Sequence, residues 1–165
     1  MENSKQVGNK FQDDFASSIP QELYYSRLKD MPSQKFKKVH NEGDYTVFSG
    51  KFMLVVECKT TKDTNLPLAN IQMNQIWKMI LAVTKLNTFG GLIVEFRKYD
   101  ICYFVPIDDF IRWYLYERNN RSNLPLTWIK ENGYKVAMKK KISRFRYGVK
   151  GLLDWVEVNF YDEGI

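Results

Sequence analysis

The sequence predicts an α/β domain in which a mixed central β-sheet is flanked by α-helices. Short apolar runs that favour strands lie at 52–59, 92–96 and 101–105. Segments whose apolar residues recur every three or four positions favour helices at 8–19, 68–86 and 109–118. A chain of 165 residues is long enough for one domain with its own core, so residues 1–165 are treated as a single unit.

The N-terminal part is expected to contain a helix and a strand. Residues 1–7 are polar and are expected to be frayed. Phe11, Phe15 and Ile19 have helical spacing, and Pro20 is expected to end that helix. A strand is expected at 23–28.

A short basic connector follows at 31–42 and carries Lys35, Lys37 and Lys38. It is either a solvated loop or a protrusion, comparable to a stalk, that contacts DNA.

A β-hairpin is expected from residue 46 to residue 59, with Ser49-Gly50 as its two-residue loop. In that register Asp44 pairs with Val55 and points to the same face as Glu57. Such diagonal neighbours lie roughly 7–8 Å apart, so two carboxylates there are able to converge on one ion. A three-residue loop would reverse the parity, so the inference depends on the turn.

The rest of the chain continues the alternation of helices and strands. We expect a polar turn at 60–65 and a chain break at Gly90-Gly91, before paired strands around 97–100. The remaining expected segments are a loop at 119–125, a short helix at 126–132, a strand or basic extended segment at 134–142 and a terminal helix at 148–157.

Composition limits the class of protein. The net charge of +6 and the pI of about 9.2 favour polyanionic partners. Two distant cysteines in apolar runs and one histidine argue against a disulfide framework and a zinc site. Residues 1–10 do not resemble a signal peptide, and no apolar run approaches the roughly 20 residues of a membrane helix. We therefore expect a cytoplasmic protein with no membrane partner.

The acids at 44 and 57, together with Lys59, are the residue types that metal-assisted phosphodiester cleavage uses. Phosphodiester cleavage needs a metal that polarises the phosphate and activates water. Mg²⁺ prefers oxygen ligands, commonly one or two carboxylates, so Asp44, Glu57 and the Cys58 backbone carbonyl are candidate ligands. Lys59 is a candidate catalytic residue that positions water and offsets charge on the phosphate. The alternative is an exposed strand end with solvated charges.

Gln75 interrupts the apolar stripe of the helix expected at 68–86. It is either a buried amide whose hydrogen bonds are satisfied or a ligand to metal or phosphate.

A basic segment near the C-terminus interleaves cations with Phe145 and Tyr147. Its cations include Lys139, Lys140, Lys141, Arg144 and Arg146. It is either a DNA-binding surface of salt-sensitive affinity or an edge strand protected by lysine.

Several motifs occur in an order that resembles RecU-like Holliday-junction resolvases of the PD-(D/E)xK nuclease superfamily. They are Gly8-x-x-Phe11, Gly43-Asp44-Tyr45, Glu57-Cys58-Lys59-Thr60, Asn70-Ile71-x-x-x-Gln75, Phe89-Gly90-Gly91-Leu92-Ile93 and Ser122-Asn123-Leu124-Pro125-Leu126. With residues 147–155, the resemblance spans roughly 8–155. It implies a restriction-endonuclease-like core, Mg²⁺ held by Asp44 and Glu57, a catalytic Lys59 and a supporting Gln75. It also implies a homodimer that nicks four-way DNA junctions.

The chain departs from this family at two places. The family's helix 1 carries a glutamate where this chain has Gln12, which brings no charge. Either Gln12 is a weak ligand, or Asp14 substitutes after a small rotation, or activity is reduced; we favour Gln12 as the site residue because it lies nearer the apolar stripe. The connector at 31–42 is also shorter than the bacterial stalk, as in phage-encoded relatives.

The sequence therefore predicts a Mg²⁺-dependent Holliday-junction resolvase that acts on branched DNA without a small-molecule cofactor, with Mn²⁺ able to substitute. The alternatives are another PD-(D/E)xK endonuclease of repair or restriction type, and a weakly active or non-catalytic junction-binding protein.

Overall fold

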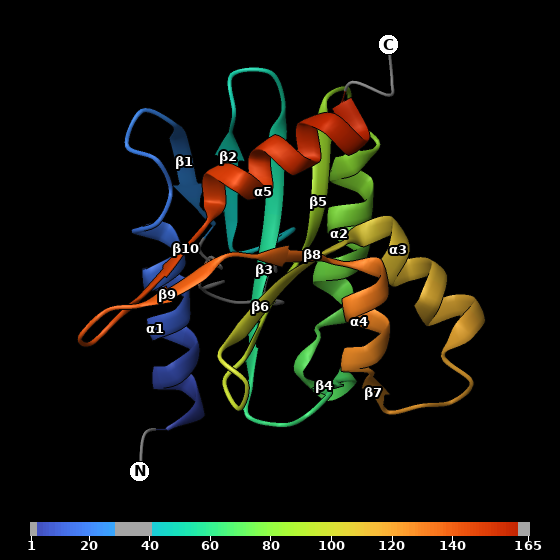
Figure 1. Ribbon diagram of the computed structural model, residues 1–165. Coiled ribbons are helices and arrows are strands. Elements are labelled where there is room, and N and C mark those ends of the chain that lie inside the picture. The colour runs from blue at the N-terminus through green and yellow to red at the C-terminus, as the bar shows by residue number, and fades with distance from the viewer. Residues whose placement is uncertain (1–2, 29–40, 162–165) are drawn as a thin grey trace, which may run out of the picture.

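A six-stranded mixed sheet forms the centre of the computed structural model, which describes residues 3–28 and 41–161. Its strand order is β1-β2-β3-β5-β6-β8 (Figure 1). The strands are β1 (Tyr24–Arg27), β2 (Tyr45–Phe48), β3 (Met53–Thr61), β5 (Thr88–Phe96), β6 (Ile101–Pro106) and β8 (Tyr134–Val136). β3 and β5 are parallel and the other neighbours are antiparallel, which confirms the predicted mixed sheet.

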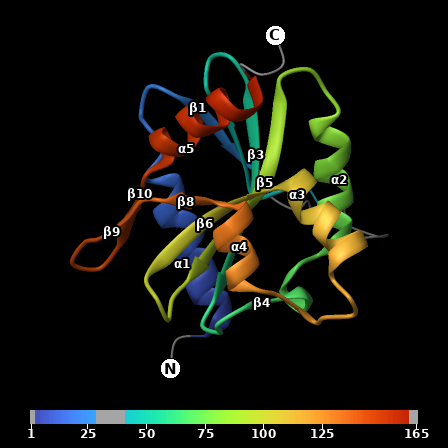
Figure 2. The ribbon, with the colours of Figure 1, turned by 45° about the vertical axis from the view of Figure 1, so that its right-hand side comes forward.

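Helices cover both faces of the sheet (Figures 1 and 2). One face packs against α1 (Ser4–Ala16), α5 (Val149–Val156) and its continuation η3 (Glu157–Tyr161). The other packs against α2 (Met73–Val83), α3 (Ile107–Arg112), η2 (Trp113–Glu117) and α4 (Leu126–Asn132). Because strand side chains alternate, each face has its own apolar core, with Val56 in the first and Val55 in the second. None of the helices described is long and apolar enough to cross a membrane.

Three short elements complete the main body. They are η1 (Leu68–Asn70) and the two-stranded ladder of β4 (Leu66–Pro67) with β7 (Asn123–Leu124). The hairpin of β9 (Met138–Lys140) and β10 (Phe145–Tyr147) instead projects from the body as an arm beside α1 (Figures 1 and 2). The predicted segment 134–142 is thus divided: β8 joins the sheet and β9 leaves it.

The first helix begins and ends about three residues earlier than predicted. Asn3 caps it, since its side chain accepts the N–H of Lys5 and its own N–H is bound by the Gln6 side chain. Residues 4–7, expected to be frayed, are therefore helical. The helix ends at Ala16 rather than at Pro20, because the Ser17 and Ser18 hydroxyls bond the Asp14 carbonyl in the last turn.

The predicted hairpin register is wrong by two residues. Phe48 pairs with Met53, so the loop holds four residues rather than two, and its Ser49 hydroxyl binds the Phe52 backbone. Phe52 is buried in the core, and this apolar anchor sets the loop length. β3 also continues through Thr61, where a polar turn was predicted, because β5 pairs with it along its whole length.

Two other predicted boundaries are wrong. Gly90-Gly91 lies inside β5 instead of breaking the chain. A Cβ on Gly91 would lie 2.4 Å from the Val105 carbonyl oxygen, so glycine here permits close packing of β5 on β6. The helix predicted at 68–86 is divided into η1 and α2 by an extended residue, Ile71.

Candidate functional site

The site is built on the central strand β3, where Glu57 and Lys59 form an ion pair. Two residues apart on one strand, they point to the same face, and Lys59 Nζ lies 2.6 Å from Glu57 Oε1. The Glu57 side chain is 3% exposed and that of Lys59 15% exposed. A buried carboxylate is very costly without a partner, so the ammonium is the partner that allows Glu57 to remain in the sheet.

Asp44 reaches the same strand through a bend at the start of β2. Its backbone N–H donates to the Val56 carbonyl, and Tyr45 also pairs with Val56. Asp44 and Tyr45 on one strand therefore lie opposite the single residue Val56 on the other, as in a β-bulge. The carboxylate Oδ2 then accepts the backbone N–H of Cys58 at 2.8 Å. The bend, rather than the predicted pairing with Val55, directs Asp44 to β3.

Gly43 makes this close approach of the two strands feasible. A Cβ at this position would lie 2.7 Å from the Val56 carbonyl oxygen, which is too close for any other residue without movement of the backbone. Gly43 and Asp44 therefore act together: the glycine permits the close approach to β3, and the aspartate carboxylate binds the Cys58 N–H there.

Cys58 lies at the centre of these charges. Burial raises the pKa of its thiol, and the Asp44 and Glu57 carboxylates raise the pKa further, so the thiol stays protonated. Its N–H faces Asp44, and the N–H and C=O of one strand residue point to the same side. The Cys58 carbonyl therefore points to the Asp44 side of β3, as a candidate ligand must.

Gln75 lies in the first turn of α2, and its side chain is 8% exposed. Its neighbours Ile76 and Met79 pack with Val55, which lies on the Glu57 face of β3. Gln75 is thus on the helix that covers this face of the sheet.

Gln12 belongs to α1, which packs on the opposite face. Its Oε1 accepts a hydrogen bond from Arg27 Nη2 at 2.8 Å, while Arg27 Nη1 binds Asp13. Arg27 also pairs with Tyr45, the neighbour of Asp44, and the Tyr45 hydroxyl donates to the Gln12 backbone carbonyl. Gln12 is therefore attached to the β1–β2 edge beside Asp44, and sequence reasoning missed Arg27 because no local pattern marks it.

Asp14 is bound to the hairpin arm rather than to Arg27, and the alternative in which it substitutes for the family's glutamate stays a prediction. Its side chain is 2% exposed, more buried than Gln12, and Oδ2 accepts the backbone N–H of Phe145. The expectation that Gln12 is the more buried of the two is wrong. The β9–β10 hairpin covers Asp14, which helical periodicity alone does not reveal.

A third buried acid, Glu95 on β5, escaped sequence reasoning. It is 4% exposed and accepts hydrogen bonds from the Thr60 hydroxyl at 2.8 Å and the Tyr147 hydroxyl at 2.9 Å. Burial and the Glu95 charge raise the pKa of Tyr147 well above its usual range, which keeps this hydroxyl a donor. The signal was available, because Glu95 interrupts the apolar run 92–96.

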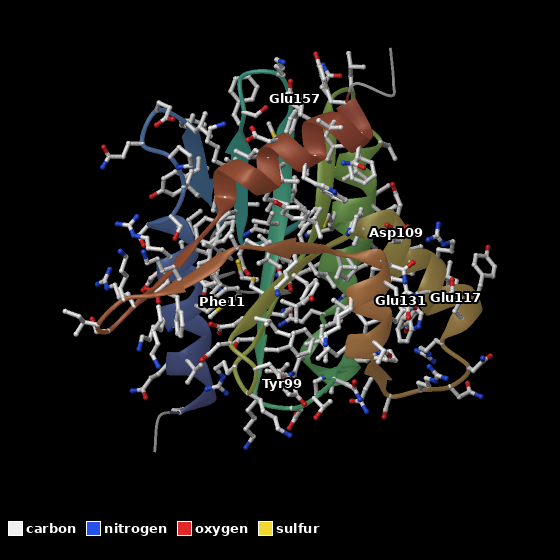
Figure 3. The ribbon with its side chains drawn as sticks, viewed as in Figure 1. Phe11, Tyr99, Asp109, Glu117, Glu131 and Glu157 are labelled. Atoms are coloured by element: carbon white, nitrogen blue, oxygen red, sulfur yellow. The ribbon has the colours of Figure 1, made fainter. Side chains whose placement is uncertain are left out.

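The predicted DNA-contacting cations divide into two groups. Lys35, Lys37 and Lys38 lie outside the described residues. The others line the hairpin arm and are exposed: Lys139, Lys140, Lys141, Arg144 and Arg146. The acids Asp109, Glu117 and Glu131 lie on the side of the molecule away from this arm (Figure 3). The arm is therefore a cationic projection.

The donors on β3 fit a hard divalent cation better than zinc. In the described part of the chain, no three or more His, Cys, Asp or Glu side chains group to hold a metal. Mg²⁺ requires fewer, because one or two carboxylates, waters and phosphate oxygens complete its shell. Asp44, Glu57 and the Cys58 carbonyl supply oxygen donors of this kind.

Two RecU proteins of Lactococcus lactis are similar in sequence to this chain. A Holliday junction resolvase RecU from Lactococcus lactis subsp. cremoris (strain MG1363) is 27% identical over 114 residues, which are 68% of this chain and 53% of the relative. The RecU of Lactococcus lactis subsp. lactis (strain IL1403) is 26% identical over 117 residues. The chain thus spans about half the length of the curated relatives it matches.

The fold has a counterpart of known structure. The Archaeoglobus fulgidus protein Hjc, a Holliday junction resolvase, superposes with a TM-score of 0.54 at 13% identity, covering 78% of this chain and 95% of Hjc. The predicted fold class, an α/β domain with a restriction-endonuclease-like core, is confirmed.

The family follows from a match that includes the bend at Asp44, the strand of Glu57 and Lys59, α2 and the hairpin arm. The family model described as Recombination protein U matches residues 22–147, well over half of the chain. The predicted resemblance is confirmed, and this chain belongs to the RecU family.

Proposed function

We propose that this protein is a structure-selective endonuclease that cleaves phosphodiester bonds at four-way DNA junctions with the help of Mg²⁺. The observation that carries the proposal is the buried Glu57–Lys59 ion pair beside a carboxylate, Asp44, held against the same strand. Two acids and an ammonium in an apolar sheet are costly to maintain, and nuclease chemistry supplies a reason for them.

Asp44 and Glu57, with the Cys58 carbonyl, would hold the cation. When bound, Mg²⁺ polarises the phosphate and lowers the pKa of the attacking water, and Mn²⁺ offers similar chemistry. The hydrogen bond from Cys58 fixes the Asp44 carboxylate in place. Its second oxygen is thereby oriented before substrate arrives, which avoids a cost of ordering.

Lys59 would act on the substrate itself. Its ammonium pairs with Glu57 in the protein alone, and a phosphate that enters the site offers a second anion to the same three donors. Lys59 orients the attacking water and balances negative charge that develops on the phosphate during cleavage. Because the pair is largely buried, this interaction is stronger than it would be in bulk water.

Two glutamines would support the site from different sides. Gln75 extends from α2 on the Glu57 face, where its amide donates to a phosphate or a metal-bound water. Gln12, held by Arg27, supports the edge that carries Asp44. Neither brings a charge, so each contributes less than the carboxylates.

The cationic arm would bind the DNA backbone, together with the lysines of the connector at 31–42. Each phosphate neutralised by lysine or arginine releases counterions, so affinity falls steeply with salt and does not depend on sequence. Selectivity for a junction would then come from shape, and a homodimer with two-fold symmetry would place one site on each of two opposed strands.

Both cysteines are free and buried, as suits a reducing cytoplasm.

Cleavage of a synthetic mobile four-way junction with Mg²⁺ tests the proposal. We expect paired, symmetric nicks in two strands of like polarity, and at least about tenfold preference over linear duplex of the same sequence, as for specific over non-specific binding. Light scattering of the protein with and without junction gives its oligomeric state.

Two other outcomes would assign other functions. Equal cleavage of junction and linear duplex would indicate a repair or restriction endonuclease. Junction binding without nicks in Mg²⁺ or Mn²⁺ would indicate a non-catalytic binding protein, an alternative that the neutral Gln12 favours.

A further inference from the structure

The tip of the hairpin arm carries an apolar side chain that the fold does not use. The Lys141 N–H donates to the Arg144 carbonyl at 2.7 Å, so Ile142 and Ser143 are the two loop residues. Ile142 is 106% exposed relative to a reference residue, more than any other large apolar side chain described. Two-residue hairpin loops usually hold Asn, Asp or Gly, so local turn chemistry does not account for isoleucine here.

The arm beneath the tip is held rigidly to the body. The Phe145 N–H donates to Asp14 of α1, and the Tyr147 N–H donates to the hydroxyl of Ser18, just after α1. The Arg146 guanidinium donates to the Ser17 carbonyl, and the buried Tyr147 hydroxyl binds Glu95 on β5. Because the base of the arm is bonded to the first helix and to the central sheet, we expect the tip to keep its position when it contacts a partner.

Cations flank the apolar tip on both strands of the arm. Lys140, Lys141 and Arg144 are exposed within two residues of Ile142, and Lys140 also lies over the Phe145 ring. A lone aliphatic residue among cations is poorly suited to an apolar protein groove. It suits nucleic acid, where phosphates attract the cations and a side chain such as isoleucine enters between base steps and unstacks them.

We propose that Ile142 is a wedge that inserts between base pairs at the branch point of a DNA junction, while the flanking cations hold the adjacent phosphates. This inference rests on the proposed function and adds how a branch is distinguished from a continuous duplex. Stacking is already interrupted where arms meet, so the wedge meets less resistance there than within a linear helix.

The test uses the full chain and a four-way junction carrying 2-aminopurine at the branch point, in EDTA so that cleavage does not interfere. Wild-type protein is expected to raise 2-aminopurine fluorescence, which reports unstacking. Ile142→Ala should abolish that rise and weaken junction binding about tenfold, the effect of no longer burying one aliphatic side chain. Binding to linear duplex should stay unchanged, and Ile142→Leu should retain both properties.

Two control variants distinguish insertion of Ile142 from other effects on binding. Leu86→Ala removes another side chain that is 90% exposed, outside the arm, and should behave as wild type. Arg144→Ala should weaken binding to junction and duplex alike and reduce its salt dependence, as expected for a phosphate contact.

Two results would overturn the inference. If wild type binds junctions selectively and Ile142→Ala matches it in affinity and fluorescence, the wedge is wrong and the proposed function stands. If wild type shows no preference for a junction, both are wrong. Because Ile142 is fully exposed, its replacement does not endanger folding.

Discussion

Glu57 and Glu95 are buried glutamates on neighbouring parallel strands, and they face opposite sides of one sheet. The two residues are almost equally inaccessible, since Glu57 as a whole residue is 2% exposed and Glu95 4% exposed. Their partners differ. Glu57 is paired with the ammonium of Lys59 on its own strand, whereas Glu95 accepts hydrogen bonds from two hydroxyls, those of Thr60 and Tyr147.

The difference distinguishes the proposed catalytic site from a structural one. Hydroxyl donors from β3 and β10 tie these two strands to Glu95 on β5 and occupy both of its oxygens. The Lys59 ammonium balances the charge of Glu57. A metal cation is able to replace the ammonium beside Glu57, and a phosphate is able to replace the carboxylate beside Lys59. Burial of an acid therefore does not by itself indicate catalysis, and the chemistry of its partner decides the role.

Glu57→Ala gives the largest expected effect on cleavage. Losing a residue that only supports a metal ligand costs about 10- to 100-fold, so losing a ligand that also pairs with Lys59 should cost at least about 1,000-fold. Single-turnover cleavage of a labelled junction measures the loss, with junction binding retained. Glu131→Ala, an exposed acid on α4 (Figure 3), is the control. Equal cleavage by Glu57→Ala would remove the assignment.

Asp44→Asn should lower cleavage by more than about 100-fold, since the variant keeps an oxygen but loses the charge that attracts a cation. The amide oxygen still accepts the Cys58 N–H, so the bend is preserved and the fold should not change. A Mg²⁺ titration measures the effect, and a raised Mg²⁺ requirement is the signature of a lost ligand. An unchanged requirement would place the cation elsewhere.

Glu95→Gln should affect stability rather than cleavage. The amide offers only one oxygen to two hydroxyl donors, so one buried hydroxyl loses its acceptor, which costs about 1–3 kcal/mol in the free energy of unfolding. Urea denaturation measures this loss. Asp154→Asn, which breaks only an exposed pair with Lys150, should cost less than about 0.5 kcal/mol. A loss of cleavage comparable to that of Glu57→Ala would contradict the structural role.

Gln12→Glu gives the smallest expected effect. The new carboxylate would lie beside Arg27, which already donates to this position, and their pairing would neutralise the added charge. Cleavage is therefore expected to change by less than about threefold, a difference below 1 kcal/mol in activation free energy. A gain of tenfold or more would show that the missing charge limits the native site.

The local sequence pattern predicted most of the helices and strands, but fewer of the residues at which they begin and end. Phe11 and Phe15 predicted α1 correctly because both enter the core, yet the Asn3 cap and the Ser17–Ser18 bonds set its ends. Gly90 and Gly91 were interpreted as a break, since a sequence does not show that another strand packs against them. Asp44 and Glu57 were predicted as a pair, but the register was wrong, and a bend holds Asp44 against the N–H of Cys58, the neighbour of Glu57.

The sequence by itself determined the family to which the chain belongs and which side chains are candidates for its chemistry. An acid or lysine within an apolar strand is costly to bury, so Glu57 and Lys59 stand out without coordinates. Only the tertiary structure decided which partner each of these polar side chains meets: Arg27 for Gln12, Phe145 for Asp14 and Tyr147 for Glu95. These contacts join residues from 15 to 131 positions apart, and at such separations packing, rather than local propensity, selects the partner.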